Sequence, residues 1–283
     1  MMHERIEKKT REQIGYMRRA GRVVADIHAA LRGAAHAGVE TQELDAIAAR
    51  VIADHGAKSN FLGYQGFPAN VCISINDTVV HGIPDSTQLK DGDLVSFDCG
   101  AYVEVDGQQW HGDAAFSMIV GGDQAGSERR VDLNDITRDS LWAAIAAVSR
   151  GGRVKNIGAA VEKVVWNAPI DLGWQPGIIE EYVGHGIGTA MHQAPDVPNF
   201  VARGHSPRLR PGMVLAIEPM LVTDDIETVT LEDGWTVKTV DGGDAAHWEH
   251  TVAILDEGIS VLTSPDCGAA GLAKYDVVPV NLD

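Results

Sequence analysis

The order of predicted elements repeats along the chain: two helices are followed by strands, and then the same order returns. Thr10 and Gln13 fit a capping box that begins a helix over about 10–33, in which apolar residues recur on one side. The other predicted elements are a helix from Thr41 to a stop at Gly56, strands within 71–120, helices over 134–150 and about 155–168, and strands at 213–222, 235–240 and 247–255. We therefore expect an α+β fold of two similar halves around one core, with helices covering one face of an antiparallel sheet.

Composition places the chain among globular proteins with a large core, because 45% of its 283 residues are hydrophobic. Its formal charge of −17 argues against a general or specific binder of nucleic acid. Residues 1–33 are the exception, since eight basic and four acidic side chains give them a net charge of +4. No apolar run approaches the roughly 18 residues of a membrane span and no secretory pattern is present, so we expect a cytoplasmic protein without membrane contact. Cys72, Cys99 and Cys267 are expected to be small buried hydrophobes.

The segment 94–116 alternates apolar and polar residues and contains an Asp-Gly turn signal, which predicts an antiparallel hairpin. With the turn centred on 104–107, residues whose numbers add up to 211 lie opposite each other. Asp98 then faces Asp113 with Cβ atoms about 5 Å apart, where like charges repel and a bound cation would remove the repulsion. For this segment alone, a solvated hairpin with two unrelated aspartates is an equally good interpretation.

Three further polar residues stand out from their surroundings. His185 lies between glycines in GHGIG, Glu218 lies in the apolar run VLAIEPM, and Glu249 lies in WEHTVAIL. A carboxylate inside an apolar strand is costly unless it is paired, protonated or bound to a metal ion. An edge position or a salt bridge could explain one of them, but four carboxylates and one imidazole together suit two divalent ions that share bridging carboxylates. A structural zinc site would use Cys and His instead.

Five motifs follow one another along the chain: HGIP at 81–84, FDCG to HGD at 97–113, GHGIG to MH at 184–192, AIEPM at 216–220, and EHT at 249–251. In this order they resemble a type I methionine aminopeptidase of the bacterial kind, over about residues 10–263. The resemblance implies the pita-bread fold, a single catalytic domain whose halves, about 10–120 and 132–256, are related by a pseudo-twofold axis. Residues 1–9 would be an N-terminal extension, and 264–283 a tail without an assigned role.

The resemblance also implies a metal site and its catalytic neighbours. Two divalent ions, of Co, Mn, Fe, Zn or Ni, would be held by five ligands: Asp98, Asp113, His185, Glu218 and Glu249. Asp113 and Glu249 would bridge both ions, Asp98 would complete one of them, and His185 and Glu218 would complete the other. His81 and His192 would be uncoordinated catalytic histidines that contact the substrate. Without the motifs, both would be interpreted as surface histidines or as satisfied core histidines.

A methionine pocket is implied by the segment 60–72. Its lining would consist of Tyr64, Phe67 and Cys72 around the substrate side chain, with His81, Met191 and Trp235 closing it. An unbranched thioether suits a pocket lined by aromatic rings and sulfur. Ordinary core packing is an equally good interpretation of Cys72 and Met191.

Two features depart from the family pattern. Phe61 stands where a smaller residue is expected, which would reduce the pocket volume. The interval from Asp98 to Asp113 is also longer than expected for the family hairpin, which predicts an extended turn between the two residues.

These assignments predict removal of the N-terminal methionine from nascent proteins whose second residue is small. Two divalent ions would lower the pKa of a bridging water, and Glu218 would take up its proton and pass it to the leaving amine. His81 and His192 would hydrogen-bond the scissile amide and the developing oxyanion. One well-placed donor of this kind stabilises the transition state by about 3–4 kcal/mol. The alternatives are a proline-directed aminopeptidase or prolidase of the same fold, and a catalytically inactive relative that only binds.

The expected partners follow from the function and from the charge distribution. Nascent polypeptide N-termini are the expected substrates, and we expect the protein to be a monomer. Arg18, Arg19 and Arg22 on the basic N-terminal helix are candidates for contact with the ribosome. A solvated helix face is an equally good interpretation of these three residues.

Overall fold

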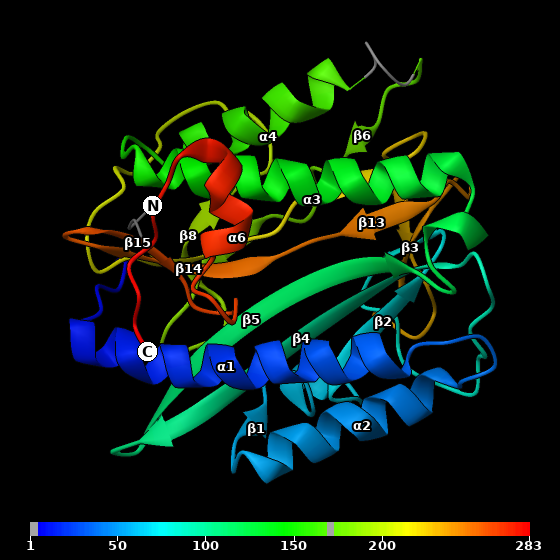
Figure 1. Ribbon diagram of the computed structural model, residues 1–283, viewed down its shortest axis with the longest axis horizontal. Coiled ribbons are helices and arrows are strands. Elements are labelled where there is room, and N and C mark those ends of the chain that lie inside the picture. Colours follow the sequence, from blue (N-terminus) through cyan, green and yellow to red (C-terminus); the bar gives the residue numbers. More distant parts are fainter. Residues whose placement is uncertain (1–4, 169–172) are drawn as a thin grey trace.

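The computed structural model describes residues 5–168 and 173–283 (Figure 1). Its helices are α1 (Arg11–Ala34), α2 (Thr41–Asp54), α3 (Glu128–Ser149), α4 (Lys155–Asn167) and α6 (Ala269–Leu272). Its strands are β1 (Lys58–Ser59), β2 (Val71–Ile75), β3 (Thr78–Val80), β4 (Leu94–Val105), β5 (Gln108–Ile119), β6 (Gly177–Ile178), β7 (Gly184–Gly186), β8 (Gln193–Val197), β9 (Val214–Ile217), β10 (Met220–Val222), β11 (Thr228–Thr230), β12 (Val237–Thr239), β13 (Ala245–His247), β14 (His250–Leu255) and β15 (Gly258–Val261). The predicted order of two helices and then strands is therefore present twice.

Local sequence signals fix the first helices. The Thr10 hydroxyl accepts a hydrogen bond from the Gln13 backbone N–H, and the Gln13 side chain accepts one from the Thr10 backbone, so the predicted capping box is confirmed. The buried side of α1 packs on β4 and β5, and α1 also packs on α2. α3 begins six residues earlier than predicted, because Ser127 caps it with its hydroxyl.

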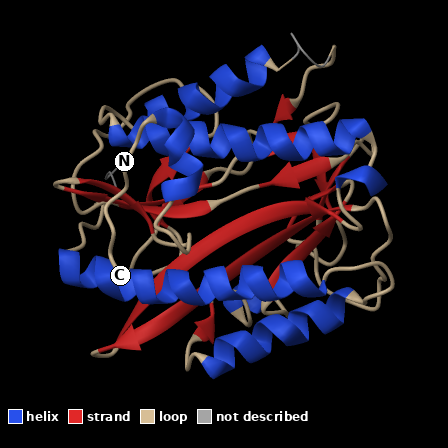
Figure 2. Cartoon of the chain, viewed as in Figure 1, coloured by secondary structure: helices blue, strands red, loops and turns tan. Residues whose placement is uncertain are grey.

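The strands of the described residues pair antiparallel, as predicted, but they divide among four sheets instead of one (Figure 2). One sheet has the order β1-β4-β2 with β5 paired to β4, and another has the order β15-β14-β9-β7-β8. Two smaller sheets have the orders β13-β10-β6 and β11-β12-β3. Helices α1 and α3 cross the strands on the side that faces the viewer in Figure 1, which leaves the opposite side of β4 and β5 for the polar residues described below.

The long β4–β5 hairpin has a different register from the predicted one. Val105 pairs with Gln108, so Asp106 and Gly107 form a tight two-residue turn, and both have positive φ. The predicted extended turn is wrong, because the additional residues lengthen the two strands instead. Asp98 lies opposite Ala115 and Asp113 lies opposite Gly100, so the two aspartates are diagonal neighbours instead of a directly facing pair. A shift of two residues keeps side chains on the same face, so both still point the same way.

The C-terminal residues, which lack a recognisable sequence pattern, are anchored to α1 through Arg18. The Arg18 guanidinium donates to the backbone oxygens of Leu262, Ser264 and Pro265 and pairs with the Asp283 carboxylate at 2.9 Å. Arg18 is therefore buried, with 3% of its surface exposed.

The three cysteines are free and buried, as predicted. Within the described ranges, no helix combines the length and apolar character that crossing a membrane would require.

Candidate metal centre and adjoining pocket

The β4–β5 hairpin positions two of the predicted metal ligands. Asp98 and Asp113 project from the face of the hairpin that lies away from α1, because Phe97 and Phe116 on the other face pack into the core. A Cβ atom at Gly100 would collide with the Asn60 side chain, so glycine leaves room for that side chain beside Asp113. Asn60 Nδ2 donates to the Gly112 oxygen at 3.1 Å, which fixes the backbone beside Asp113.

The other three predicted ligands come from the second half of the chain. His185 lies in β7 and pairs with Ala216 of β9, and Glu218 directly follows β9. Glu249 directly precedes β14 and exchanges two backbone hydrogen bonds with Ala115 of β5, at 2.9 and 3.3 Å. This exchange joins the two halves at the site and brings the carboxylates from both halves together.

The ligand atoms form two overlapping groups. In the first, one ligand atom each of Asp113, His185 and Glu249 lies within 4.8 Å of the others, and in the second the same holds for Glu218, His247 and Glu249. His185 Nε2 is 3.4 Å from Glu218 Oε1. Asp98 belongs to neither group but lines the same cavity. The structure thus brings the five predicted ligands to one place and adds His247.

Burial makes these carboxylates unfavourable as free anions. Asp113 and Glu249 are 3% and 2% exposed. Burial, more than the neighbouring carboxylates, raises the pKa of both well above the usual range. Burial also raises the pKa of Asp98 to about 7 and that of Glu218 to about 8. A group of four such carboxylates requires protons or cations for stability.

The unpaired atoms show that cations fit better than an internal hydrogen-bond network. Asp98 Oδ1, Asp113 Oδ1 and Glu249 Oε1 are buried without a hydrogen-bond partner. Burial lowers the pKa of His185 to about 3, so its imidazole is neutral and can act as a ligand. Oxygen-rich ligands with one or two imidazoles suit divalent first-row metal ions. The residues present therefore fit a divalent metal pair.

A small cavity of about 70 Å³ joins the carboxylates to an apolar wall. The apolar and aromatic lining consists of Phe61, Tyr64, Phe67, Cys72, Met191 and Trp235, and the polar lining consists of His81, Asp98, Asp113, His185, His192, Glu218 and Glu249. This volume holds about five water-sized groups, which is room for the four heavy atoms of a methionine side chain. Phe61 contacts Phe67 edge to face and occupies part of the apolar side.

The two predicted catalytic histidines lie at the edge of this cavity. His192 Nδ1 is 3.0 Å from the Tyr64 hydroxyl, and its ring centroid lies 4.3 Å from that of His185. His81 has a φ of 58°, a left-handed conformation that is uncommon for residues with a side chain. Its ring packs edge to face on Tyr182 and Trp235. Burial lowers the pKa of both histidines, that of His81 to about 4.

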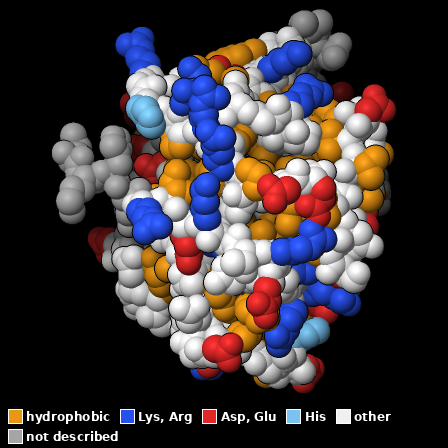
Figure 3. Space-filling model, turned by 90° about the vertical axis from the view of Figure 1, so that its left-hand side faces the viewer, with side chains coloured by type: hydrophobic (Ala, Val, Ile, Leu, Met, Phe, Trp, Pro, Cys, Tyr) orange, Lys and Arg blue, Asp and Glu red, His pale blue; other side chains and the backbone are white. Residues whose placement is uncertain are grey.

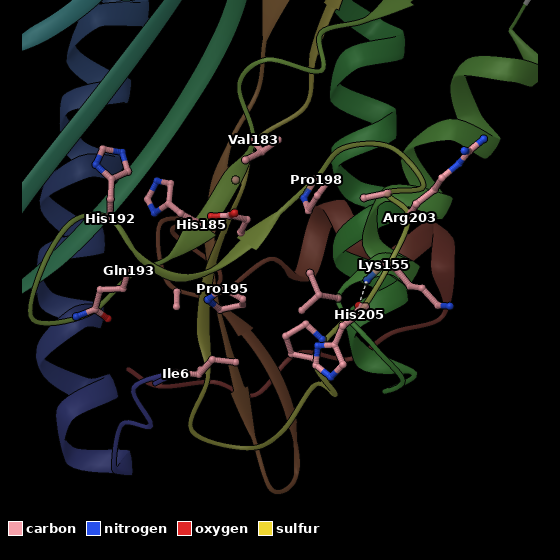
Figure 4. A pocket seen from close by; sticks show the side chains of 17 residues that line it. Ile6, Lys155, Val183, His185, His192, Gln193, Pro195, Pro198, Arg203 and His205 are labelled. Carbon is pink, nitrogen blue, oxygen red and sulfur yellow. Dashed lines mark hydrogen bonds between the residues drawn. The ribbon is translucent and has the colours of Figure 1, made fainter. Parts of the chain in front are cut away.

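A second and wider cavity, of about 730 Å³, lies on the other side of His185 and His192 (Figure 4). Its far side carries Lys155 and Arg203, whose side chains point away from the two histidines in Figure 4. The Lys155 backbone N–H donates to the Ser206 hydroxyl at 2.9 Å. Asp196 is the one carboxylate among the described residues that line this space. Of the five predicted metal ligands, His185 alone lines this space.

Sequence reasoning missed residues that hold the ligands in place. The Thr251 hydroxyl donates to the backbone oxygen of Asp113 at 2.7 Å and accepts from the Asp113 backbone N–H at 3.0 Å. Asn199 Nδ2 donates to the backbone oxygen of Glu218 at 3.0 Å. Thr251 lies within the EHT motif, where its hydroxyl was an available signal, whereas nothing near Asn199 in the sequence indicates its contact. His247 was detectable by the same signal as Glu249, since it is a polar residue in an apolar run.

Comparison with known proteins gives a consistent result. The model of metallopeptidase family M24 matches residues 15–256. The chain is 48% identical to methionine aminopeptidase 1 of Mycobacterium tuberculosis, over 91% of this chain and 95% of that protein. It is 42% identical to methionine aminopeptidase 1 of Bacillus subtilis, over 90% of this chain and 98% of that protein.

Solved structures extend the comparison to the fold. The methionine aminopeptidase of Thermotoga maritima superposes with a TM-score of 0.84 at 36% identity, covering 92% of this chain and 100% of that chain. A prolidase of Pyrococcus furiosus superposes with a TM-score of 0.67 at 19% identity, over 91% of this chain and 65% of that chain, which shows a likeness of fold alone. The predicted α+β pita-bread fold is confirmed. The chain belongs to metallopeptidase family M24 and, within it, to the methionine aminopeptidases.

Proposed function

We propose that this protein hydrolytically removes the N-terminal methionine of nascent polypeptides whose second residue is small. The observation that carries the proposal is a small cavity in which an apolar wall of aromatic rings and sulfur adjoins a wall of buried carboxylates. Such a wall suits a thioether side chain. The other wall suits metal-assisted hydrolysis of the bond beside it. The unit that carries this activity would be residues 10–263, with halves at about 10–120 and 132–256.

Membership of this family implies two divalent metal ions, which is the cofactor predicted from the sequence. Asp113 and Glu249 would bridge the two ions, Asp98 would complete one, and His185 and Glu218 would complete the other. Support for this assignment comes from the unpaired oxygens of Asp98, Asp113 and Glu249. When bound, the metal pair supplies Lewis acidity that makes water a nucleophile near neutral pH.

Glu218 would accept the proton of the attacking water and pass it to the leaving amine. Its position supports this role, because its carboxylate lines the cavity and its backbone oxygen is held by Asn199. His192 and His81 would donate hydrogen bonds to the substrate. In the His192 tautomer that accepts from the Tyr64 hydroxyl at Nδ1, the Nε2–H of the ring would donate to the developing oxyanion.

The direct test is release of methionine from the peptide Met-Ala-Ser by the purified protein with Mn²⁺, Co²⁺ or Fe²⁺. We expect release with at least one of these ions and none after chelation. Absence of release with every ion would contradict the proposal. Bound metal, measured on the same samples, also tests the alternative of an inactive relative, because such a protein need not retain its ions.

A proline-directed activity is the second candidate, because the prolidase superposition shows that this fold also occurs in that class. The aromatic and sulfur-lined wall favours a methionine side chain instead. Parallel assays on Met-Ala and Xaa-Pro peptides separate the two candidates. We expect cleavage of Met-Ala only, and preferential cleavage of Xaa-Pro would reverse the assignment.

Contact with the ribosome is proposed through Arg19 and Arg22 of α1, in a cytoplasmic monomer. Arg18, the third predicted contact residue, is buried against the C-terminal residues and is removed from the proposal. Arg22 is exposed, with its guanidinium 3.5 Å from the Asp283 carboxylate. Lys and Arg side chains run down the face of the molecule drawn in Figure 3.

The double variant R19E/R22E tests the α1 contact. We expect weaker co-sedimentation with ribosomes and unchanged cleavage of Met-Ala-Ser, because both side chains lie outside the cavity. Unchanged co-sedimentation would mean that Arg19 and Arg22 belong to a solvated helix face and do not contact the ribosome.

A further inference from the structure

His247 is a buried histidine at the metal centre that the sequence-based ligand set does not include. It is the last residue of β13 and is 2% exposed. Its Nε2 has no hydrogen-bond partner and lies 3.6 Å from Glu218 Oε2. A buried imidazole nitrogen without a partner requires a physical explanation, because a buried polar atom that is left unsatisfied destabilises the fold.

The backbone around His247 is fixed to the strands that carry the aspartates. β13 pairs with β10 so that His247 lies opposite Met220, two residues after Glu218. The His247 N–H donates to the hydroxyls of Ser96 and Ser117, at 3.2 and 3.0 Å. The Ser117 hydroxyl donates in turn to the backbone oxygen of His247 at 2.9 Å. β4, β5 and β13 thus hold the imidazole in place beside the carboxylates.

The distances around Glu218 match those between ligand atoms on a common ion. Tetrahedral ligands with bonds of about 2.1 Å are separated by about 3.4 Å. The two Glu218 oxygens each face one imidazole, His185 Nε2 at 3.4 Å and His247 Nε2 at 3.6 Å. His247 also forms a compact group with Glu218 and Glu249, while His185 forms another with Asp113 and Glu249. The two groups share one carboxylate and contain one imidazole each.

We propose that His247 Nε2 is a sixth protein ligand, which binds one ion of the pair together with Glu218 and Glu249. This inference rests on the proposed dinuclear metal centre, but it does not depend on the choice of substrate. The ion pair then has two imidazole ligands in total, His185 and His247. Because imidazole favours Co²⁺, Ni²⁺ and Zn²⁺ over Mn²⁺ more strongly than a carboxylate or water does, His247 would shift the metal preference of the centre towards these ions.

X-ray absorption spectroscopy of the protein loaded with two equivalents of Co²⁺ counts the imidazoles directly. We expect an average of one imidazole per ion in the unchanged protein, and half that number in His247→Gln. The matched control is His28→Gln, which removes another buried histidine whose Nε2 lies 3.0 Å from the Ala114 oxygen, away from the cavity. This control should leave the count unchanged. An average of half an imidazole per ion in the unchanged protein would overturn the proposal, whether or not the variants fold.

Metal affinity provides the second readout and separates coordination from hydrogen bonding. Glutamine retains a donor that could reach Glu218 but is a poor ligand for these ions. Loss of the ligand should therefore weaken binding of the second Co²⁺ equivalent by about 100-fold in a calorimetric titration, and should reduce the preference for Co²⁺ over Mn²⁺. Unchanged affinity and metal preference in His247→Gln would assign the histidine to a hydrogen bond with Glu218. Cleavage of Met-Ala-Ser by the unchanged protein tests the proposed function separately.

Discussion

The two walls of the small cavity are built on opposite physical principles. Buried carboxylates form one wall, and their burial is unfavourable unless cations or protons neutralise them. The other wall consists of packed rings, whose burial stabilises the fold. For example, the ring centroids of Phe67 and Trp235 are 5.1 Å apart. The walls meet where Cys72 pairs with Asp98 between β2 and β4. The apolar wall can thus serve stability and substrate fit at once, whereas the charged wall serves catalysis at the expense of metal-free stability.

The largest effect is expected from removing one charge of the bridging pair in Asp113→Asn. This substitution keeps the shape but removes a ligand, so kcat/KM should fall by about 10³-fold, because the metal pair contributes several kcal/mol to the transition state. The metal-free variant should be at least as stable as the metal-free parent at pH 8, since a buried charge has been removed. Kinetics, metal analysis and denaturation in chelator measure the three quantities. Retention of two tightly bound ions would show that Asp113 is not a ligand.

The pH dependence of stability should reverse when metal binds. In the metal-free protein, the pKa values of Asp98 and Glu218 are raised to about 7 and about 8, so these two carboxyl groups bind more protons in the folded state than in the unfolded state above about pH 4. Buried histidines whose pKa is lowered oppose this effect below about pH 6.5 but are neutral in both states above it, so the free energy of unfolding should decrease as the pH rises from about 6.5 to about 8. With metal bound, the ligands are held deprotonated, and stability should instead decrease as the pH falls.

Denaturant titrations across this pH range, with metal and with chelator, measure both slopes. Parallel curves in the two conditions would mean that the charged wall is not the origin of the pH dependence. The variant Asp113→Asn should flatten the metal-free curve, because it removes one of the titrating groups.

Phe61→Ala tests the apolar wall. The variant should lose about 3 kcal/mol of unfolding free energy, because it leaves a cavity among buried rings. It should also raise KM for Met-Ala-Ser while leaving the affinity for metal unchanged. The matched control is Leu62→Ala, whose side chain is 57% exposed and should change stability by less than about 0.5 kcal/mol. Weaker metal binding in Phe61→Ala would show that the two walls are not separable.

The smallest effect is expected from Thr251→Val, which removes the two hydrogen bonds to the Asp113 backbone without removing a ligand. Metal affinity should fall by about tenfold, in the range usual for groups that support a ligand. Thr230→Val on the exposed strand β11 is the control and should have no effect. A loss as large as that of Asp113→Asn would indicate that the hairpin itself had shifted.

Local sequence signals were sufficient for α1 and for the face of the hairpin. The capping residues Thr10 and Gln13 and the alternation in 94–116 act between near neighbours, so a sequence pattern reveals them. The hairpin register was wrong by two residues, because the position of the tight turn depends on Asp106 and Gly107 both adopting positive φ. The shared face survived, since an even shift preserves side-chain direction.

Long-range contacts could not be predicted in the same way. The Arg18 contacts with the C-terminal residues join positions more than 240 residues apart, so the basic pattern of α1 suggested a free surface where the side chain is buried. His247 stands out locally as a polar residue in an apolar run, but its placement beside Glu218 depends on the pairing of β13 with β10 and on contacts with Ser96 and Ser117, which no local pattern reveals. Family resemblance supplied the five predicted ligands, but it did not supply this sixth candidate.

The most direct test of the charged wall is a crystal structure of the protein loaded with Mn²⁺, with anomalous diffraction used to locate the ions. Two anomalous peaks are expected in the small cavity, both within bonding distance of Asp113 and Glu249. Absence of peaks there, or a single ion bound outside the cavity, would contradict the assignment of these buried carboxylates to a dinuclear metal centre.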